Sequence, residues 1–419
     1  MARIVLTTIG SLGDLHPMIA LGLELRRRGH NVVINTWEGY REKIDALGFE
    51  FFPLRPDVDI EDTEIHRKVM DASTGPEFVI KDLMMGNIRD TYEDLITAID
   101  GADLFISGEI VYAADAASKI SGVPWISTSL APVSMFSAED PSIYMQSALL
   151  EMAWSLPAFF HRGMQSIMGL VMKPWLAEYR SFRRKLGLSE DHDPIKSDKF
   201  SPLLHLVMFS KALGKPQSDW PKNFVQTGAC FYDESEMTVL DQKLESFLGN
   251  GEQPIVFTLG SAAVMDAGSF FDESAKAAKI LGRRAVLLYG RDQKLPSGLS
   301  DEIVAFEYAP YSLVFPRAAC VIHQAGVGTT GQVLRAGVPH LIMPFSHDQP
   351  DNAARCRRAG VAEVISRDSY TAETAANALK TIISDEKYRT NAAALKRIVD
   401  SESGTAAACD AIEAVLPER

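Results

Sequence analysis

Residues 323–361 read HQAGVGTTGQVLRAGVPHLIMPFSHDQPDNAARCRRAGV, and they carry the clearest indication of the fold class. Its histidine closes the apolar run AACVIH and a glycine turn follows; TTGQVLRAG and VPHLIMPF then have the patterns of a short helix and a buried strand. Two such strands joined by a helix are parallel neighbours in a sheet. Because ligands bind beyond the carboxyl ends of parallel strands, the glycine turn marks an expected binding site.

The same alternation of strand and helix runs through both halves of the chain. At the start, ARIVLTTIG, LHPMIALGLELRRRGH and NVVINTW read as strand, helix and strand, and QPIVFTLGSA at 253–262 begins a second series. Between the two series, residues 211–222 hold a glycine, two prolines and little periodicity, which is typical of a linker. A chain of 419 residues is long enough for two domains. We therefore predict an α/β protein with two open halves.

The net charge and the cysteines indicate which partners and which cellular location to expect. The net charge of −13 opposes a nucleic-acid partner, because the phosphate backbone would be repelled. The cysteines lie far apart and form no CxxC pair, which indicates reduced thiols and a cytoplasmic location. The apolar run at 4–9 is too short for a signal peptide. The four cysteines are Cys230, Cys320, Cys356 and Cys409.

Residues 152–172, MAWSLPAFFHRGMQSIMGLVM, are the most hydrophobic long stretch. Pro157, His161, Arg162 and Gln165 interrupt it, so we expect no transmembrane segment there. The pattern favours a buried or cleft-lining amphipathic helix.

Residues 326–331 spell GxGxxG directly after a strand, and Asp348 follows about twenty residues later, as in dinucleotide-binding enzymes. The motif supports an NAD(P)-dependent oxidoreductase as an alternative function. Two features oppose it: several strands of the second half precede the motif, and the helix after it is short. Either function uses the same physics, because free N–H groups at a helix start attract a phosphate or diphosphate.

The stretch 323–361 resembles the donor-binding signature of the UDP-glycosyltransferase superfamily. The resemblance rests on the leading histidine, the glycine turn, and the RAGVP and HDQPDNA segments, and it covers essentially the whole chain. It extends to PIVFTLGS at 254–261, YAPYSLVFPRA at 308–318 and GSLGDLHP at 10–17. The GSxGD pattern in the last of these resembles the branch of sterol glucosyltransferases, glycopeptide-antibiotic glycosyltransferases and the rhamnosyltransferase of rhamnolipid synthesis.

The resemblance implies the GT-B fold, in which two Rossmann-like domains face each other across a cleft. It implies an acceptor-binding domain at 1–215 and a nucleotide-sugar-binding domain at 216–395. A C-terminal helix at 396–419 is expected to pack back onto the first domain.

For the donor, the resemblance implies that His323 contacts the diphosphate and that the backbone at Gly328 and Thr329 caps it. Asp348 and Gln349 are implied to hydrogen-bond the sugar hydroxyls, where a carboxylate beside an amide discriminates between sugars. The other implied donor-site residues are Gly326, Ser261 and Tyr308.

Two tyrosines mark the expected base-binding wall. Tyr308 stands where many family members have a tryptophan that stacks on the base, and an aromatic ring there can still stack. Core packing is the alternative for this ring. Tyr311 falls where a glutamine is common in the family.

The N-terminal turn offers two candidates for the general base. Aligned through its glycine and proline, GDLHP puts Asp14, rather than His16, where much of the family has a catalytic histidine. We therefore predict that Asp14 takes the acceptor proton. An ordinary carboxylate, with a pKa of about 4, is a weak base for an alcohol, so burial would help by raising this pKa. The alternatives are a helix N-cap for Asp14 and a helix-start residue at the cleft mouth for His16.

The acceptor is expected to be a hydrophobic small molecule, such as a phenol, polyketide, sterol or hydroxy-fatty acid. The expected acceptor-site residues are Ser11, His16, Glu109 and Phe136. Aromatic and sulfur-containing side chains favour an apolar pocket, with core packing as the alternative. These side chains are Met135, Phe136, Trp154, Phe159 and Phe160.

No metal is expected. Asp57-Val58-Asp59 is a DxD, which in other glycosyltransferases holds Mn²⁺ or Mg²⁺ on the diphosphate. Here it lies in an acidic loop of the acceptor half, which favours a solvated loop. The helix start and the histidine are expected to neutralise the leaving group.

The predicted reaction is inverting glycosyl transfer without a cofactor, from a nucleotide sugar to a hydroxyl. UDP-glucose is the first choice of donor and a dTDP-sugar the second. The alternatives are the oxidoreductase, a sugar-nucleotide epimerase on the same fold, and a catalytically silent binding module. The chain is expected to be a monomer or a weak dimer.

Overall fold

The computed structural model describes residues 1–59, 62–145, 148–233, 239–290, 293–297 and 299–416. Within them, a first parallel sheet has seven strands in the order β3-β2-β1-β4-β5-β6-β7. Their bounds are Arg3–Thr7 (β1), Asn31–Thr36 (β2), Glu50–Pro53 (β3), Leu104–Ser107 (β4), Trp125–Ser129 (β5), Leu204–Val207 (β6) and Phe224–Gln226 (β7). The central strands are buried on both faces, which explains their continuous apolar runs.

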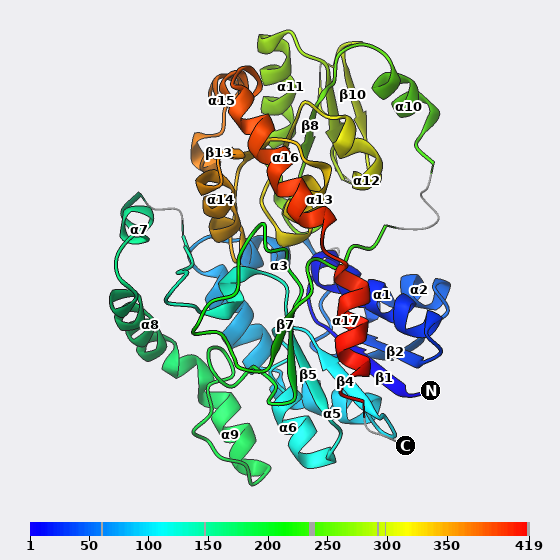
Figure 1. Cartoon of the computed structure of the whole chain (residues 1–419), viewed down its shortest axis with the longest axis vertical. Coiled ribbons are helices and arrows are strands. Elements are labelled where there is room, and N and C mark those ends of the chain that lie inside the picture. Colours follow the sequence, from blue (N-terminus) through cyan, green and yellow to red (C-terminus); the bar gives the residue numbers. More distant parts are fainter. Residues whose placement is uncertain (60–61, 146–147, 234–238, 291–292, 298, 417–419) are drawn as a thin grey trace.

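A second parallel sheet has six described strands in the order β10-β9-β8-β11-β12-β13. Their bounds are Ile255–Thr258 (β8), Ala285–Leu288 (β9), Ile303–Phe306 (β10), Cys320–His323 (β11), His340–Ile342 (β12) and Ala362–Val364 (β13). Figure 1 shows the two domains one above the other, each with helices on both faces of its sheet. The expected two-domain α/β architecture is confirmed.

Helices connect the strands. In the first domain they are α1 (Leu12–Arg27), α2 (Arg41–Ala46), α3 (Thr63–Val69), α4 (Gly75–Glu77), α5 (Ile88–Ala98), α6 (Ala114–Ser121), α7 (Ala148–Ala153), α8 (Ala158–Met172) and α9 (Ala177–Lys185). In the second they are α10 (Gln242–Gly249), α11 (Phe270–Leu281), α12 (Tyr311–Val314), α13 (Val327–Ala336), α14 (Gln349–Arg358), α15 (Ala372–Ser384) and α16 (Glu386–Asp400). Helix α17 (Gly404–Glu413) follows α16.

The first domain extends beyond the predicted boundary at residue 215. Strand β7 lies after that boundary and pairs with β6, so the first sheet includes residues 224–226. The predicted linker at 211–222 is therefore a connection between two strands of one sheet. Its Trp220 packs edge-on against Phe209 and Phe224, which gives this proline-containing segment a small core of its own.

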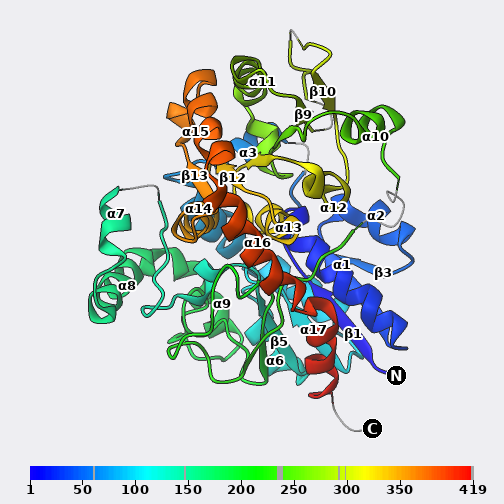
Figure 2. The ribbon, with the colours of Figure 1, turned by 45° about the horizontal axis from the view of Figure 1, so that its top comes forward.

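The C-terminal segment returns to the first domain, but later than residue 396. That residue lies inside α16, which packs on α13 of the second domain. The chain leaves the helix after Asp400, and α17 then packs on α1. Arg28 of α1 binds Asp410 at 2.6 Å and Glu413 at 2.7 Å. In Figure 2, α16 and α17 run as one red path from the upper domain to the lower one.

Two helices reach across between the domains. The end of α3 and the residues after it dock on the second domain, where the His347 Nε2–H donates to the Val69 carbonyl (2.8 Å) and the Ser346 hydroxyl donates to the Asp71 carbonyl (3.1 Å). On the opposite side, Arg355 of α14 binds Asp140 of the first domain at 2.5 Å. Contacts from α3 and from α14 thus hold the two domains together.

The expectation of a buried or cleft-lining helix at 152–172 is wrong for its outer face. Helix α8 lies on the outside of the first domain, and the side chains of Phe159 and Leu170 are 73% and 70% exposed. Its inner face packs on the first domain, and His161 and Met172 are the buried residues of the helix. No helix in the described part of the chain is long and apolar enough to cross a bilayer.

Candidate active site

Asp14 lies in the first turn of α1, just beyond the carboxyl end of β1. Ser11 is the N-cap, and its hydroxyl accepts from the Gly13 N–H at 3.2 Å. The Asp14 carboxylate reaches back and accepts from the Ser11 N–H at 2.9 Å, which completes a capping box. Asp14 is therefore the third residue of the helix rather than its N-cap, and the hydrogen bond fixes its carboxylate at the turn.

The surroundings of Asp14 make it a stronger base than an ordinary carboxylate. Burial raises its pKa to about 7, and the charges of Glu109 and Asp348 act in the same direction. Gly10 lies directly beneath: its φ is +132°, and a Cβ there would come within 2.3 Å of the Asp14 carboxylate. Glycine is thus required for this carboxylate position.

Glu109 follows β4 and lies near Asp14 in the first domain. Its carboxylate accepts hydrogen bonds from the Leu130 N–H and the Ser134 hydroxyl, in the segment after β5. Glu109 therefore holds the loop that leads into the expected acceptor wall. With an aspartate as base, the Glu109 charge raises the pKa of Asp14.

The other acceptor-side residues lie near this loop or on α1. Phe136 has a φ of +48°, an uncommon value for a bulky residue, and its carbonyl accepts from the Gln165 side chain of α8 at 2.8 Å. The Lys199 ammonium lies 5.1 Å from the centre of the Phe136 ring and 5.4 Å from the centre of the Phe200 ring. The His16 ring meets Tyr232 edge-on at 5.2 Å.

The donor side centres on the turn before α13. Gly326 is its N-cap, and the N–H groups of the first helical turn have no partner within the helix. That of Val327 donates to Asp348 at 2.9 Å, which leaves those of Gly328 and Thr329 for an anion. A Cβ on Gly328 would lie 3.8 Å from the Gly13 Cα, so the donor turn touches the turn of the first domain.

Asp348 and Gln349 already have partners within the protein. Asp348 accepts from the Val327 N–H and from the Asn352 amide at 2.7 Å. Burial raises the pKa of Asp348 to about 7, and the Glu109 charge also raises it. The Gln349 amide oxygen accepts from the Phe345 N–H at 2.8 Å. Their predicted contacts with sugar hydroxyls stay predictions.

His323 points into the second domain rather than toward the glycine turn. It is fully buried, its Nδ1 accepts from the Ala325 N–H at 3.0 Å, and its Nε2 lies 3.0 Å from the His340 Nδ1. Burial holds the pKa of His323 well below its usual range, so the ring is neutral. Its predicted contact with the diphosphate stays a prediction.

Gln324 is the residue that faces the glycine turn. A Cβ on Gly260 would come within 2.1 Å of its amide nitrogen, and one on Gly326 within 2.8 Å. The amide therefore lies between the turn after β8 and the turn after β11. Among the described residues its oxygen is buried without a hydrogen-bond partner, so it can accept from a hydroxyl, while the amide N–H groups can donate to a phosphate oxygen. Alternation of side chains along β11 is the signal that could have identified Gln324 instead of His323.

The remaining donor-site residues lie at the carboxyl ends of neighbouring strands. Ser261 is exposed just after β8. Tyr308, after β10, is 48% exposed, which leaves its ring accessible for stacking. Tyr311 is half-buried, stacks on Phe315, and its hydroxyl is hydrogen-bonded to the Thr258 hydroxyl at 2.9 Å, so it packs against the core of the second domain.

The arrangement brings a raised-pKa carboxylate from one domain to an anion-binding helix start from the other. In the described residues, no group of three or more His, Cys, Asp or Glu is placed to hold a metal ion. Asp57 and Asp59 lie in the loop after β3. A base facing an anion-binding turn suits the transfer of a group from a diphosphate to a hydroxyl.

Comparisons with known proteins agree with this geometry. A model described as "UDP-glucoronosyl and UDP-glucosyl transferase" matches residues 220–402, and a "Glycosyltransferase family 28 N-terminal domain" model matches residues 4–150. The chain is 30% identical to an O-mycaminosyltylonolide 6-deoxyallosyltransferase of Streptomyces fradiae, over 98% of this chain and 97% of that protein. It is 23% identical to a sterol 3-beta-glucosyltransferase of Arabidopsis thaliana, over 99% of this chain and 66% of that protein.

Solved structures show the same fold. The glycosyltransferase of kitacinnamycin superposes with a TM-score of 0.76 at 21% identity, over 99% of both chains. Two parallel-sheet domains of this kind define the GT-B fold, and the oxidoreductase alternative gains no support. From these matches and its own two turns, the chain belongs to the UDP-glycosyltransferase superfamily and is a glycosyltransferase of the GT-B fold.

Proposed function

We propose that this chain transfers a glycosyl unit, with inversion, from a nucleotide diphosphate sugar to a hydroxyl of an apolar small molecule. The acceptor oxygen attacks the anomeric carbon as its proton passes to Asp14. The bond from that carbon to the diphosphate breaks, and the nucleoside diphosphate leaves with the bonding electrons. The single observation that carries the proposal is the position of the Asp14 carboxylate, which is fixed in the turn of the first domain that meets the donor turn of the second.

The leaving group is stabilised by this chain's own groups in the proposed reaction. The N–H groups of Gly328 and Thr329 and the positive end of α13 receive the diphosphate. Gln324 adds its amide, and Ser261 adds its hydroxyl. Gln324 thus takes the role that the sequence suggested for His323. No metal ion is part of the proposed reaction.

UDP-glucose is the proposed donor, with a dTDP-sugar as the second choice. The matched family model names UDP-glucosyl transfer, whereas the Streptomyces relative is named for a deoxyhexose. The names of the relatives support a polyketide or sterol acceptor. We propose a cytoplasmic enzyme, consistent with the buried, free state of all four cysteines.

The test uses UDP-glucose and dTDP-glucose with a panel of phenols, macrolides and sterols. Asp14→Asn is expected to lower kcat by about 10²–10⁴-fold, the usual contribution of a general base. Its thermal stabilisation by UDP is expected to persist. His16→Ala serves as the matched control on the same turn and is expected to lose less than tenfold.

Three results would contradict the proposal. A larger loss in His16→Ala than in Asp14→Asn would assign the base to the histidine. Consumption of the donor at the same rate without any acceptor would indicate an epimerase or hydrolase. Thermal stabilisation by NAD but not by UDP or dTDP would restore the oxidoreductase.

A further inference from the structure

Helix α8 presents an apolar face to solvent. Phe159, Ile167 and Leu170 recur at helical spacing, and with Gly163 and Val171 they form one continuous stripe. The exposed fractions of Ile167 and Val171 are both 64%. The apolar face continues through the turn toward α7. The exposed apolar side chains of this face, α7 and the turn are Met152, Leu156, Phe159, Phe160, Met164, Ile167, Leu170 and Val171.

The charge of this segment is opposite to that of the chain. Residues 152–185 carry six basic side chains and one acidic one, in a protein with a net charge of −13. Arg183 is buried against Asp115, and Arg162 and Arg184 pair with nearby glutamates. Among the described residues, no carboxylate lies within 4 Å of the exposed Lys173 and Lys185 ammonium groups. A basic surface beside an apolar stripe is what an anionic lipid surface attracts.

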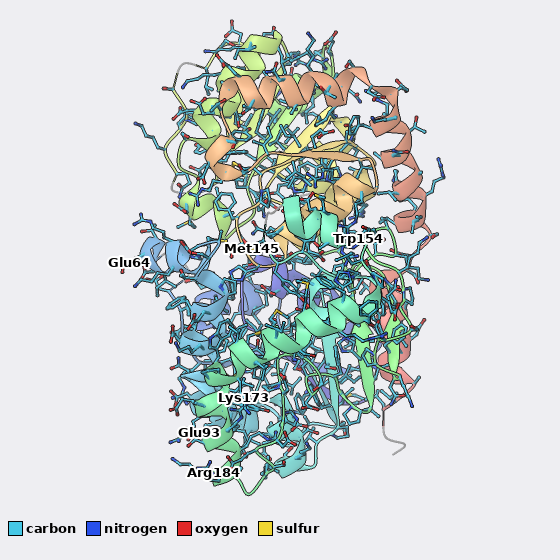
Figure 3. All side chains as sticks on the ribbon, turned by 90° about the vertical axis from the view of Figure 1, so that its left-hand side faces the viewer. Glu64, Glu93, Met145, Trp154, Lys173 and Arg184 are labelled. Atoms are coloured by element: carbon cyan, nitrogen blue, oxygen red, sulfur yellow. The ribbon has the colours of Figure 1, made fainter. Side chains whose placement is uncertain are left out.

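The stripe and the cations lie on one side of the molecule. In Figure 3, α8 crosses the face toward the viewer, with Trp154 near the second domain, Lys173 at the far end of the helix and Arg184 below it. Trp154 and Trp175 precede and follow α8 in the sequence and are both half-buried. The Trp154 ring packs under the Arg358 guanidinium and Trp175 packs against the core of the first domain, so the exposed stripe of α8 itself is the apolar part of this surface.

The inner side of the same helix touches the expected acceptor wall. Gln165 donates to the Phe136 carbonyl, and Met168 packs with Phe136 against the core of the first domain. A lipid surface under α8 would therefore lie next to the segment that leads to Glu109 and Asp14.

We propose that α8 and its flanking residues 152–185 form a docking surface for an anionic lipid bilayer. The helix lies in the plane of the interface, with the Phe159–Leu170 stripe in the apolar boundary and Lys173 and Lys185 at the headgroups. Docking in this way places the acceptor side of the cleft beside a reservoir of apolar molecules. Vesicle binding does not depend on glycosyl transfer, so the two proposals fail separately.

The experiment is co-sedimentation of the full chain with vesicles of phosphatidylcholine, alone or mixed with phosphatidylglycerol. We expect binding to the mixed vesicles that weakens as salt rises, and little binding to phosphatidylcholine alone. Ile167→Ser combined with Leu170→Ser is expected to lower the bound fraction about tenfold. Ile280→Ser, at an exposed position of α11 in the other domain, is the matched control and is expected to bind as the parent does.

Charge and position are tested separately. Lys173→Glu with Lys185→Glu is expected to weaken binding about tenfold, whereas Arg389→Glu on α16 is expected to leave it unchanged. Brominated lipids are expected to quench the fluorescence of the tryptophan added in Ile167→Trp but not that of the one added in Ile280→Trp. This measurement reports the position of the helix directly, without a variant that impairs binding. Equal unfolding temperatures for parent and variants confirm that each variant folds.

Two outcomes would overturn the proposal. Vesicle binding that is the same for the α8 variants and the parent, or that ignores anionic lipid, would exclude this surface. A concentration-dependent dimer that the α8 substitutions abolish, without any vesicle binding, would assign the stripe to a second copy of the chain.

Discussion

Asp14 and Asp348 belong to different domains, and the negative charge of Asp348 raises the pKa of Asp14. Both carboxyl groups have a pKa of about 7, mainly because each is removed from water. The protonation of the proposed base therefore depends on a residue of the donor domain. The effect of Asp348 on the pKa of Asp14 exists because the two domains are in contact.

The pH profile of kcat/KM should show this coupling. Activity is expected to rise with pH up to about 7, because Asp14 must lose its proton before it can act as a base. Asp348→Asn removes one of the charges that raise this pKa, so the rising limb should move to lower pH. A limb that stays in place in Asp348→Asn would show that the two groups do not interact in solution.

The same pKa predicts an unusual dependence of stability on pH. Asp14 has a pKa raised from 3.8 to about 7 in the folded chain, so its contribution to stability is greatest below pH 3.8 and is lost as pH rises to about 7. At pH 8, Asp14→Asn should therefore have a free energy of unfolding up to ~4 kcal/mol higher than that of the parent. Its unfolding temperature should be higher as well. The gain should shrink as the pH falls to 5. Differential scanning fluorimetry across this range measures it, and an equal effect at both pH values would contradict the prediction.

Gly10 should matter for catalysis, beyond its effect on stability. In Gly10→Ala the new methyl group displaces the Asp14 carboxylate, which would lie 2.3 Å from it. Gly29→Ala is the matched control, since Gly29 also has a positive φ but has no atom within 4 Å of the added Cβ. Both variants should lose about 1 kcal/mol of stability. Only Gly10→Ala should also lose kcat, by about 10²-fold or more.

Arg355 should hold the domains together through a buried ion pair. Its side chain is only 6% exposed, and it binds Asp351 at 2.8 Å in its own helix and Asp140 across the interface. Arg355→Met leaves these carboxylates unpaired and should cost about 3–5 kcal/mol in unfolding free energy. Arg184→Met, which breaks the exposed pair with Glu190, should cost less than about 1 kcal/mol.

A double-mutant cycle isolates the contact between the domains. Asp140→Asn combined with Arg355→Met should be less destabilised than the sum of the two single variants, because the pair shares one interaction. The single variants should also raise the KM for the acceptor more than the KM for the donor, since Asp140 leads into the acceptor wall. Additive free energies would show that Arg355 acts only within its own helix.

Local sequence patterns predicted several of the sheet strands and the two-domain architecture. β1, β2 and β8 are short apolar runs that end in a small polar residue, and such runs allow few other structures. β7 gave no such signal, because it has only three residues at a sheet edge, after a segment with two prolines. The strand propensity of single residues says little about a strand whose pairing depends on residues far away in the sequence.

The candidate site was predicted less completely, for geometric reasons. The turns around Asp14 and Gly328 were identified from residue type and spacing. The resemblance implied a role for His323, and the structure shows its side chain buried against His340. The apolar pattern of α8 is the same for a buried helix and an exposed one, so only tertiary packing could place its stripe outside.

The return of α17 to α1 makes the first domain discontinuous along the chain. Arg28 meets Asp410 and Glu413 only after the entire second sheet has been synthesised. On the ribosome, the second domain therefore has all its strands before the first domain receives its final helix. Until then the side of α1 that faces Cys409 stays open to solvent and to chaperones. The first domain is thus synthesised first but is the last to complete its fold.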